Sequence, residues 1–415
     1  MTLALSAVAA PGTAAAPSSP ACSYVALSPA FGRDRTGACT LIDRASGNVP
    51  TVHVTRDAGR SWRRASAVGL TQAESGSLRP IFSPRYGSDA TLYVATQDGL
   101  YASTDLGETF APVAALVPQA NGQNPVVFVS TTAPPPTNAV APGARVLIAG
   151  AYGEKSAVYD SRLGVARPIL GTPGGTRYFA APPVPTPDAP PLAFVMESRP
   201  KPDRPYGGGL VAYACDHELA CAERRFAFPD DLYLQNVKVA QWGRTTVYVA
   251  LMLDMDADRW TTWRSTDGGR TFTPWRSLDA VLAATGRGVG TTPVFSVAAD
   301  PTAPGTWWLR VSASPERLWE PAMPPSEQLF VSGRTGDGWR RVGYQLDPNH
   351  RGRRGTLPWD ARGGADGDEP AQVTVAPDGR LFVLGTRQGT DRVPGLTAVW
   401  CSTDRGRTWR PSCAR

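Results

Sequence analysis

The chain has 415 residues, of which 42 are glycine, 40 are proline and 12 are tryptophan, and 42% of the residues are hydrophobic. This composition excludes a disordered chain, and because glycine and proline interrupt helices it favours an all-β protein with many short strands. The formal charge of +6 comes from arginines spread along the sequence, without the clustered basic stripe of nucleic-acid-binding proteins, so we expect no nucleic-acid partner.

The N-terminal residues 1–21 contain a small apolar stretch, residues 3–16, with Ala-x-Ala cleavage character but no basic residue before it. We interpret residues 1–21 as the remnant of a secretory signal peptide, with a flexible N-terminus as the alternative. No later apolar run approaches the roughly 18 residues that span a bilayer. We therefore expect a secreted, extracellular monomer with no membrane span.

One octapeptide, Ser/Thr-x-Asp-x-Gly-x-Ser/Thr-aromatic, occurs four times, at 55–62, 103–110, 265–272 and 402–409. In a hairpin turn, an Asp carboxylate can accept backbone N–H bonds and a glycine can adopt a positive φ, while the aromatic residue enters the core. We therefore expect structural rather than catalytic roles for Asp57, Gly59, Trp62, Asp105, Gly107, Phe110, Asp267, Gly269, Phe272, Asp404, Gly406 and Trp409.

This octapeptide resembles the Asp box, or BNR repeat, of the sialidase-like and sortilin-like β-propellers. Around each copy, three strand-like runs precede the octapeptide and a fourth follows it, which is the content of one propeller blade. Weaker copies of the unit fill the gaps, with turns near residues 57, 105, 160, 216, 267, 337 and 404. The sequence thus predicts a single seven-bladed β-propeller of four-stranded antiparallel blades over residues 22–415.

The six cysteines fall into three close pairs, which predict local disulfides, although fifteen pairings are possible. A zinc site would need Cys-x-x-Cys spacing or nearby histidines, and the sequence has three scattered histidines. We expect no metal and no cofactor, and a disulfide in the turn near residue 216 in place of an octapeptide. The predicted pairs are Cys22 with Cys39, Cys215 with Cys221, and Cys401 with Cys413.

Three further segments could carry function. Residues 133–142 form a proline-rich loop, and residues 343–369 form a long polar insertion in the propeller. The alternating run Asp254, Asp256 and Asp258 invites a metal or catalytic interpretation, but we favour an exposed turn between blades.

An enzyme of sialidase type is one functional hypothesis. Members of that family carry a Phe/Tyr-Arg-Ile-Pro motif, three arginines, a Tyr nucleophile paired with Glu, and an Asp acid/base on six blades. Here the nearest string is Leu78-Arg79-Pro80-Ile81, in the wrong order and leading into a strand. The xyloglucanase group, which the chain also resembles, usually packs two propellers around a cleft, whereas the repeat units of this sequence account for one propeller. No catalytic residue can be assigned.

A noncatalytic propeller is the other hypothesis, and it requires no missing motif. The repeat pattern also resembles photosystem-assembly and sortilin-like proteins, whose propellers bind partners. We therefore predict a protein- or glycan-binding face at the central channel. The alternative is a glycoside hydrolase with its site at the mouth of that channel. Convergent arginines with a Tyr–Glu pair, or two facing carboxylates, would favour the enzyme.

Overall fold

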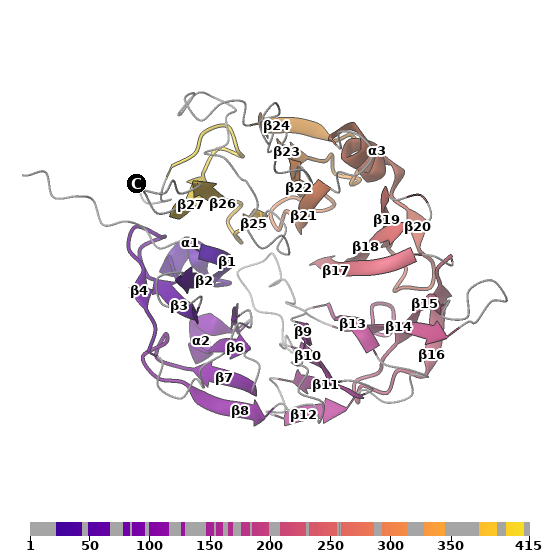
Figure 1. Cartoon of the computed structure of the whole chain (residues 1–415), viewed down its shortest axis with the longest axis horizontal. Helices are drawn as coiled ribbons and strands as arrows, with labels where there is room; N and C mark the ends of the chain where they lie inside the picture. Colours follow the sequence, from indigo (N-terminus) through magenta and orange to yellow (C-terminus); the bar gives the residue numbers. More distant parts are fainter. Residues whose placement is uncertain are drawn as a thin grey trace, which may run out of the picture.

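The computed structural model places most of the predicted strands (Figure 1). The described residues are 22–43, 49–66, 78–83, 85–95, 99–115, 126–128, 147–152, 155–160, 165–168, 176–182, 185–198, 208–229, 232–254, 257, 259–285, 293–313, 328–344, 373–387 and 396–410. The signal-peptide interpretation of 1–21, the loop 133–142 and residues 345–369 of the predicted insertion lie outside them.

The protein is mostly β, with antiparallel sheets whose strands follow one another in chain order. The first sheet is β1 (Cys22–Leu27), β2 (Gly37–Asp43), β3 (Val49–Thr55) and β4 (Arg63–Arg64). The second is β5 (Arg79–Phe82), β6 (Leu92–Ala95), β7 (Gly99–Ser103) and β8 (Ala111–Ala115). The third is β9 (Val126–Phe128), β10 (Leu147–Tyr152), β11 (Lys155–Asp160) and β12 (Val165–Pro168).

Four more sheets follow. The fourth is β13 (Thr176–Ala180), β14 (Leu192–Ser198), β15 (Gly208–Ala214) and β16 (Glu223–Ala227). The fifth is β17 (Leu232–Trp242), β18 (Thr245–Asp254), β19 (Arg259–Ser265) and β20 (Thr273–Pro274). The sixth is β21 (Pro293–Ala299), β22 (Trp307–Ala313), β23 (Gln328–Val331) and β24 (Arg340–Tyr344). The seventh is β25 (Val373–Val375), β26 (Leu381–Arg387) and β27 (Leu396–Ser402).

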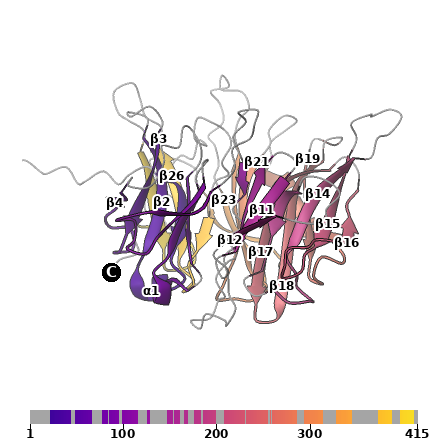
Figure 2. The same ribbon diagram turned by 90° about the horizontal axis from the view of Figure 1, so that it is seen from below.

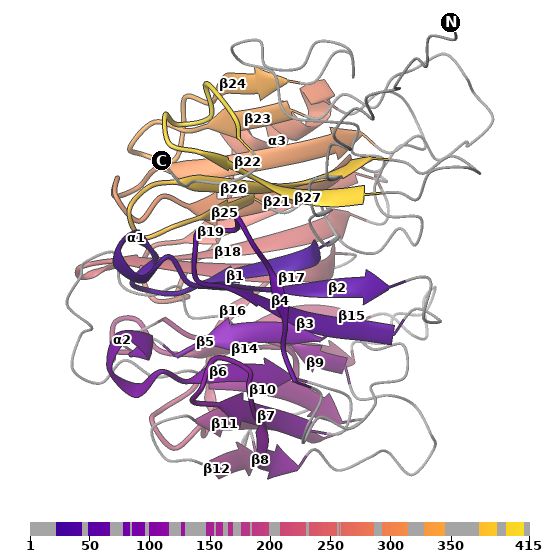
Figure 3. The same ribbon diagram turned by 90° about the vertical axis from the view of Figure 1, so that its left-hand side faces the viewer.

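Each sheet contacts the next one, and the first sheet also contacts the last. Figure 3 shows β26 and β27 beside β1. In this contact the buried residues Val25 and Phe31 pack with Phe382 and Cys401, and the rings of Phe31 and Phe382 meet edge to face at 5.0 Å. Apolar clusters of the same kind fill the spaces between the fourth, fifth, sixth and seventh sheets. The core therefore lies between sheets, where both faces of a sheet are covered.

The seventh sheet differs from the four-stranded expectation in the described residues. The segment predicted as its fourth strand forms one bridge, in which Cys401 and Arg410 exchange two backbone hydrogen bonds of 2.8 and 2.9 Å. Arginine at 410 is followed by proline, which cannot donate to a ladder.

The described residues are mostly β, as expected, but they also form three helices. Two of them, α1 (Phe31–Asp34) and α2 (Tyr86–Asp89), are single turns between the first two strands of their sheets. The third, α3 (Arg276–Thr285), follows the short strand β20 and lies against β19. It buries Leu278 and Leu282, whose four-residue spacing places them on one helical face. No described helix is long and apolar enough to cross a membrane.

The sheets have two distinct ends, which Figure 2 shows in side view. In an antiparallel sheet of consecutive strands, the turns from first to second and from third to fourth strand lie at the same end. That end carries α1, α2 and all four octapeptide turns, and we call it the octapeptide end. The hairpin between second and third strands lies at the other end, which we call the hairpin end.

Candidate functional site

The four octapeptides form the same turn, between the third and fourth strands or, in the seventh sheet, before the Arg410 bridge. In the second sheet, Ser103 donates to Asp105 Oδ1 at 2.8 Å and accepts from the Gly107 N–H at 2.7 Å. Asp105 also accepts from the backbone N–H and the hydroxyl of Thr109, at 2.9 and 2.7 Å. Equivalent bonds surround Asp57, Asp267 and Asp404.

These bonds stabilise the ionised carboxylates. Hydrogen bonds from Thr109 lower the pKa of Asp105 to about 2. At Asp57, Asp267 and Asp404, burial alone would raise the pKa, but the bonds from turn hydroxyl and N–H groups outweigh it and the net shift is downward. A carboxylate held in this way is a poor proton carrier near neutral pH, and its geometry serves the turn.

In the second and fifth sheets, the fifth octapeptide position requires glycine because the turn packs against the preceding sheet. Gly107 and Gly269 have φ of +79° and +82°. A Cβ atom on Gly107 would lie 2.8 Å from Ala65 Cβ, and one on Gly269 would lie 2.7 Å from Leu192 Cδ1. The turns therefore join neighbouring sheets as well as neighbouring strands.

The aromatic residues of the octapeptides are not all buried, contrary to our expectation. Phe110 and Phe272 lie in the core, 5% and 3% exposed. Trp62 and Trp409 are only half-buried and pack at the margins of their clusters.

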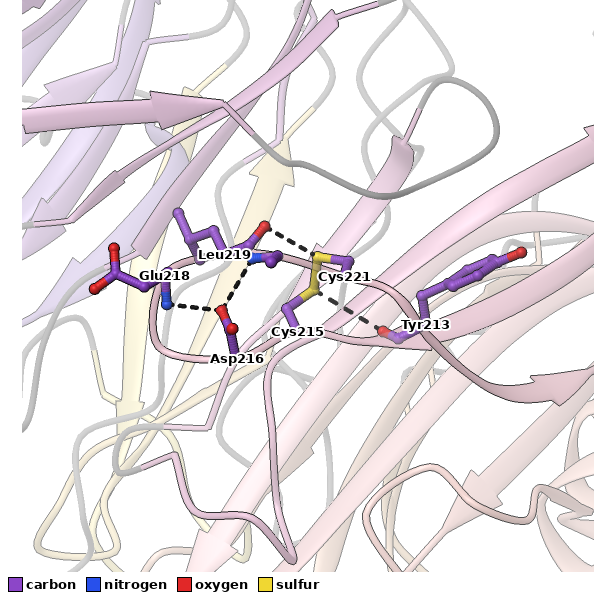
Figure 4. The surroundings of a disulfide bond; sticks show 7 residues. Tyr213, Cys215, Asp216, Glu218, Leu219 and Cys221 are labelled. Carbon is purple, nitrogen blue, oxygen red and sulfur yellow. Dashed lines mark hydrogen bonds between the residues drawn. A yellow bond between two sulfur atoms is a disulfide. The ribbon is translucent and has the colours of Figure 1, made fainter.

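The predicted disulfide Cys215–Cys221 is confirmed, and Figure 4 shows it in the turn between β15 and β16. This turn occupies the place of an octapeptide. Asp216 Oδ1 accepts from the backbone N–H groups of Glu218 and Ala220 at 2.8 and 3.0 Å, and the bond from Ala220 matches the one that Asp105 accepts from Thr109. The remaining predicted pairings involve the side chains of Cys22 and Cys413, which lie outside the described part. Cys39 and Cys401 are both disulfide-bonded.

A Tyr–Glu pair with one arginine lies on the last three strands of the fourth sheet. Tyr213 donates a short hydrogen bond to Glu197 Oε1, and Arg224 Nη2 lies 3.5 Å from Glu197 Oε2. Tyr213 is 6% exposed, and it packs with Val195 and Val211. The Tyr213 hydroxyl thus donates to a side chain of the same sheet, and the three side chains link β14, β15 and β16.

The first residue of the acidic run, Asp254, belongs to the paired strands of one sheet and not to a turn between blades as expected. Asp254 ends β18 opposite Arg259, which begins β19, and Arg259 Nε lies 3.5 Å from Asp254 Oδ2. Asp256 and Asp258 lie outside the described residues. Among the residues that are described, no group of three or more His, Cys, Asp or Glu could hold a metal ion.

Asp279 is a half-buried carboxyl with a different environment. Burial raises its pKa, against the opposing effects of Thr262 and of Arg276 and Arg259. Its Oδ1 accepts from the backbone N–H and the hydroxyl of Thr262 at 2.8 and 2.7 Å. The strand β20 pairs only with Trp263 and Arg264 of β19. Asp279 therefore accepts the backbone hydrogen bond from Thr262 that a longer β20 would have accepted.

An aromatic and aliphatic row lies at the hairpin end of the fifth sheet. Tyr233 of β17 pairs with Leu253 of β18, which in turn pairs with Trp260 of β19. Cross-strand partners project from the same face, so the three side chains form one strip. Tyr233 is 42% exposed, whereas Leu253 and Trp260 are half-buried. We call these three residues the Tyr233 row, and the ion pair of Asp254 and Arg259 borders it.

Our sequence interpretation did not identify this row, which lies near the start of β17 at Leu232. The signal was the apolar alternation of Leu232 and Leu234 around Tyr233. A second missed signal is the repeat of Ser-Pro-x-aromatic-x-x-Asp-x-Thr at 28–36 and 83–91, which forms α1 and α2.

No family model and no curated protein matches the chain. Among solved structures, the GH74 xyloglucanase from Xanthomonas campestris is 16% identical, with a TM-score of 0.45 over 95% of this chain and 60% of that one. Saccharomyces cerevisiae Sqt1 is 9% identical, with a TM-score of 0.47 over 96% and 86% of the two chains. A polysaccharide lyase of family PL25, an ulvan lyase, is 9% identical, with a TM-score of 0.35 over 95% and 84%. The chain thus spans about three fifths of the xyloglucanase, and TM-scores below 0.5 assign no activity.

Proposed function

We propose that this chain is a secreted, noncatalytic seven-bladed β-propeller of the Asp-box kind that binds a glycan on the Tyr233 row. The exposed ring of Tyr233 carries the proposal. A tyrosine offers a rigid apolar face and a hydroxyl, so it can stack on the C–H face of a sugar ring and keep its polar end in water. Asp254 and Arg259 at the border supply an acceptor and donors for sugar hydroxyls.

The architecture supports the propeller part of the proposal. Seven sheets in chain order, with the first in contact with the last, are what a closed seven-bladed ring requires. The four identical turns, with their Ser/Thr–Asp–Gly hydrogen bonds, have the chemistry expected of Asp boxes. Because disulfides persist in oxidising compartments, the bonded cysteines Cys39, Cys215, Cys221 and Cys401 favour secretion.

The geometry of the Tyr213 group supports a noncatalytic role. A tyrosine nucleophile must present its oxygen to substrate, but Tyr213 is buried and its hydroxyl is bonded to Glu197. The second oxygen of Glu197 faces Arg224, so the group is satisfied within one sheet.

The test measures binding and turnover on the same oligosaccharides. Isothermal titration with neutral β-glucan and sialoside oligosaccharides should give saturable binding to at least one of them. Tyr233→Ala should then weaken binding at least tenfold, about 1.4 kcal/mol, whereas Tyr233→Trp, which keeps an aromatic face, should retain it. Arg407→Gln, at the octapeptide end, is the control and should bind as the wild type does.

Three results would overturn the proposal. They are release of new reducing ends from any of these substrates, no binding to any of them, and equal binding by the wild type and a folded Tyr233→Ala variant.

A further inference from the structure

We infer that a second surface, at the octapeptide end of the first and second sheets, binds an acidic polysaccharide through Arg33, Arg35, Arg56 and Arg85. We call these four residues the arginine surface. It lies at the end opposite to the Tyr233 row, and it shares with the proposed function only the oxidising compartment that the disulfides favour.

Positive charge is concentrated in the first sheet. Its described residues, 22–43 and 49–66, contain six arginines and three aspartates, a surplus of three. The whole chain carries a surplus of six over 415 residues, so about a tenth of the chain holds half of the surplus. Three of these six arginines, Arg33, Arg35 and Arg56, belong to the arginine surface. The sequence interpretation found no basic stripe because they and Arg85 belong to three separate turns that only the fold brings together.

Three contacts bring the turns together. The Ala58 N–H donates to Arg35 O at 3.0 Å, which places the end of α1 against the first octapeptide turn. Ala30 Cβ lies 4.0 Å from the Cβ position of Gly87, so α1 and α2 are neighbours. The charges of Asp34 and Arg56 both act on the Tyr86 hydroxyl of α2.

The arginines of this surface are free to bind an external anion. All four are exposed, and Arg33, Arg35 and Arg56 have no ion pair with any described carboxylate. Arg85 Nε lies 4.0 Å from Asp89, a long contact between a 57% exposed arginine and a partly exposed carboxylate. Such surface ion pairs contribute little to stability, so an external anion can replace the Asp89 carboxylate.

The neighbouring aspartates are engaged inside their turns. Asp34 accepts from Ser28 Oγ at 2.5 Å and from the Thr36 N–H at 2.9 Å, and Asp89 accepts equivalent bonds from Ser83 and Thr91. Asp57 is bound by its octapeptide turn, as described above. The carboxylate oxygens thus close the turns, while the guanidinium groups project into solvent.

An acidic polysaccharide fits this arrangement best. Guanidinium groups bind carboxylates and sulfates with two parallel hydrogen bonds, and several arginines on one surface match the repeated charges of such a polymer. The half-buried ring of Tyr86, whose hydroxyl lies within reach of the Arg56 charge, offers an apolar contact for a sugar ring. The disulfides favour an oxidising compartment outside the cytoplasm, where acidic glycans rather than nucleic acids are the common polyanions.

The test compares two triple variants with the same change in net charge. Arg33→Gln, Arg35→Gln and Arg56→Gln together should weaken binding to polygalacturonate or dextran sulfate at least tenfold at low salt. The control combines Arg244→Gln, Arg334→Gln and Arg340→Gln, three exposed arginines of the fifth and sixth sheets, and should change affinity less than twofold. Wild-type binding should weaken as salt rises, because salt screens exposed charges.

A single substitution tests the same surface with less risk of misfolding. The other three octapeptides have threonine at the position of Arg56, namely Thr104, Thr266 and Thr403. The fold should therefore accept Arg56→Thr. This substitution should weaken binding about threefold with an unchanged melting temperature. Tyr233→Ala should leave binding to the acidic polymer unchanged.

Equal losses in both triple variants would reduce the effect to net charge and overturn the inference. Absence of binding to both acidic polymers would also overturn it. Tighter binding to duplex DNA, or to vesicles of anionic lipid, than to polygalacturonate and dextran sulfate would show a different partner and reject an acidic polysaccharide.

Discussion

The Cβ position of Gly107 lies 2.8 Å from the Cβ atom of Ala65, which belongs to the preceding sheet. Ala65 is 7% exposed and its N–H donates to Val52 O, so its backbone has little room to move. The octapeptide glycine is therefore constrained twice, by its positive φ and by the neighbouring sheet.

Gly107→Ala should destabilise the protein more than Gly59→Ala does. Both glycines occupy the fifth octapeptide position, with φ of +79° and +85°, so the conformational cost of about 1 kcal/mol is shared. The Cβ position of Gly59 meets only its own Trp62, at 3.6 Å, whereas that of Gly107 overlaps Ala65. We expect overpacking to add about 1–3 kcal/mol at Gly107, measured by urea unfolding.

A double variant tests the cause of that difference. Adding Ala65→Gly to Gly107→Ala should restore part of the lost stability, because it removes the overlapping methyl group. Purely additive effects of the two substitutions would contradict the contact.

The octapeptide turns were recognisable in the sequence because each requires a fixed set of residue types within eight positions. Together with the weaker copies between them, they predicted seven units, and the described strands form seven sheets. Helix α3 was not recognised, because it begins just after β20, the strand that follows the third octapeptide, where a fourth strand was expected to continue. Its apolar spacing at Leu278 and Leu282 becomes meaningful only when the sixth sheet is present to cover it.

The candidate sites depend on tertiary contacts that the sequence does not display. Arg35 and Arg56 are 21 residues apart, and only the bond between Arg35 and Ala58 shows that they share a surface. Tyr213 and Glu197 likewise meet because β14 and β15 pair in one register. Predicting such a site requires the register of the sheet, because a one-residue shift moves every side chain of a strand to the opposite face.

Arg405→Gln should destabilise the contact between the sixth and seventh sheets. Arg405 Nη2 lies 3.1 Å from Asp300 Oδ2, and the Asp300 side chain is only 3% exposed. Removing the guanidinium leaves a buried carboxylate with only the donors of Thr302 and Trp308. Because Arg405 itself is 59% exposed, we expect a moderate loss of about 1–2 kcal/mol in chemical unfolding.

Arg407→Gln is the matched control for this prediction. Arg407 belongs to the same turn and is exposed, and its backbone N–H, which donates to Asp404, is unaffected by the change. It should alter stability by less than about 0.5 kcal/mol. Equal losses from the two substitutions would show that the ion pair with Asp300 contributes nothing.

Asp279→Asn should change the pH dependence of stability in one direction. Burial raises the pKa of Asp279 above its unfolded value of 3.8, so the folded state binds the proton more tightly. The stabilisation that protonation provides is present below about pH 4 and is lost as pH rises through the folded pKa. Relative to Asp279→Asn, whose Oδ1 can still accept from Thr262, the wild type should lose melting temperature as pH rises from about 3 to 7. A constant difference between the two proteins would contradict the shift.

Asp105→Asn should show the opposite dependence. The Thr109 hydroxyl and N–H lower the folded pKa of Asp105 to about 2 from 3.8. The resulting stabilisation is fully present above about pH 4 and is lost as pH falls towards 2, because the unfolded chain takes up the proton first. Above about pH 5 the wild type should therefore melt at a higher temperature than Asp105→Asn by a constant margin. That margin should shrink between about pH 4 and pH 2. A margin that persists unchanged at pH 2 would mean that the difference in stability between the two proteins does not come from the carboxylate charge.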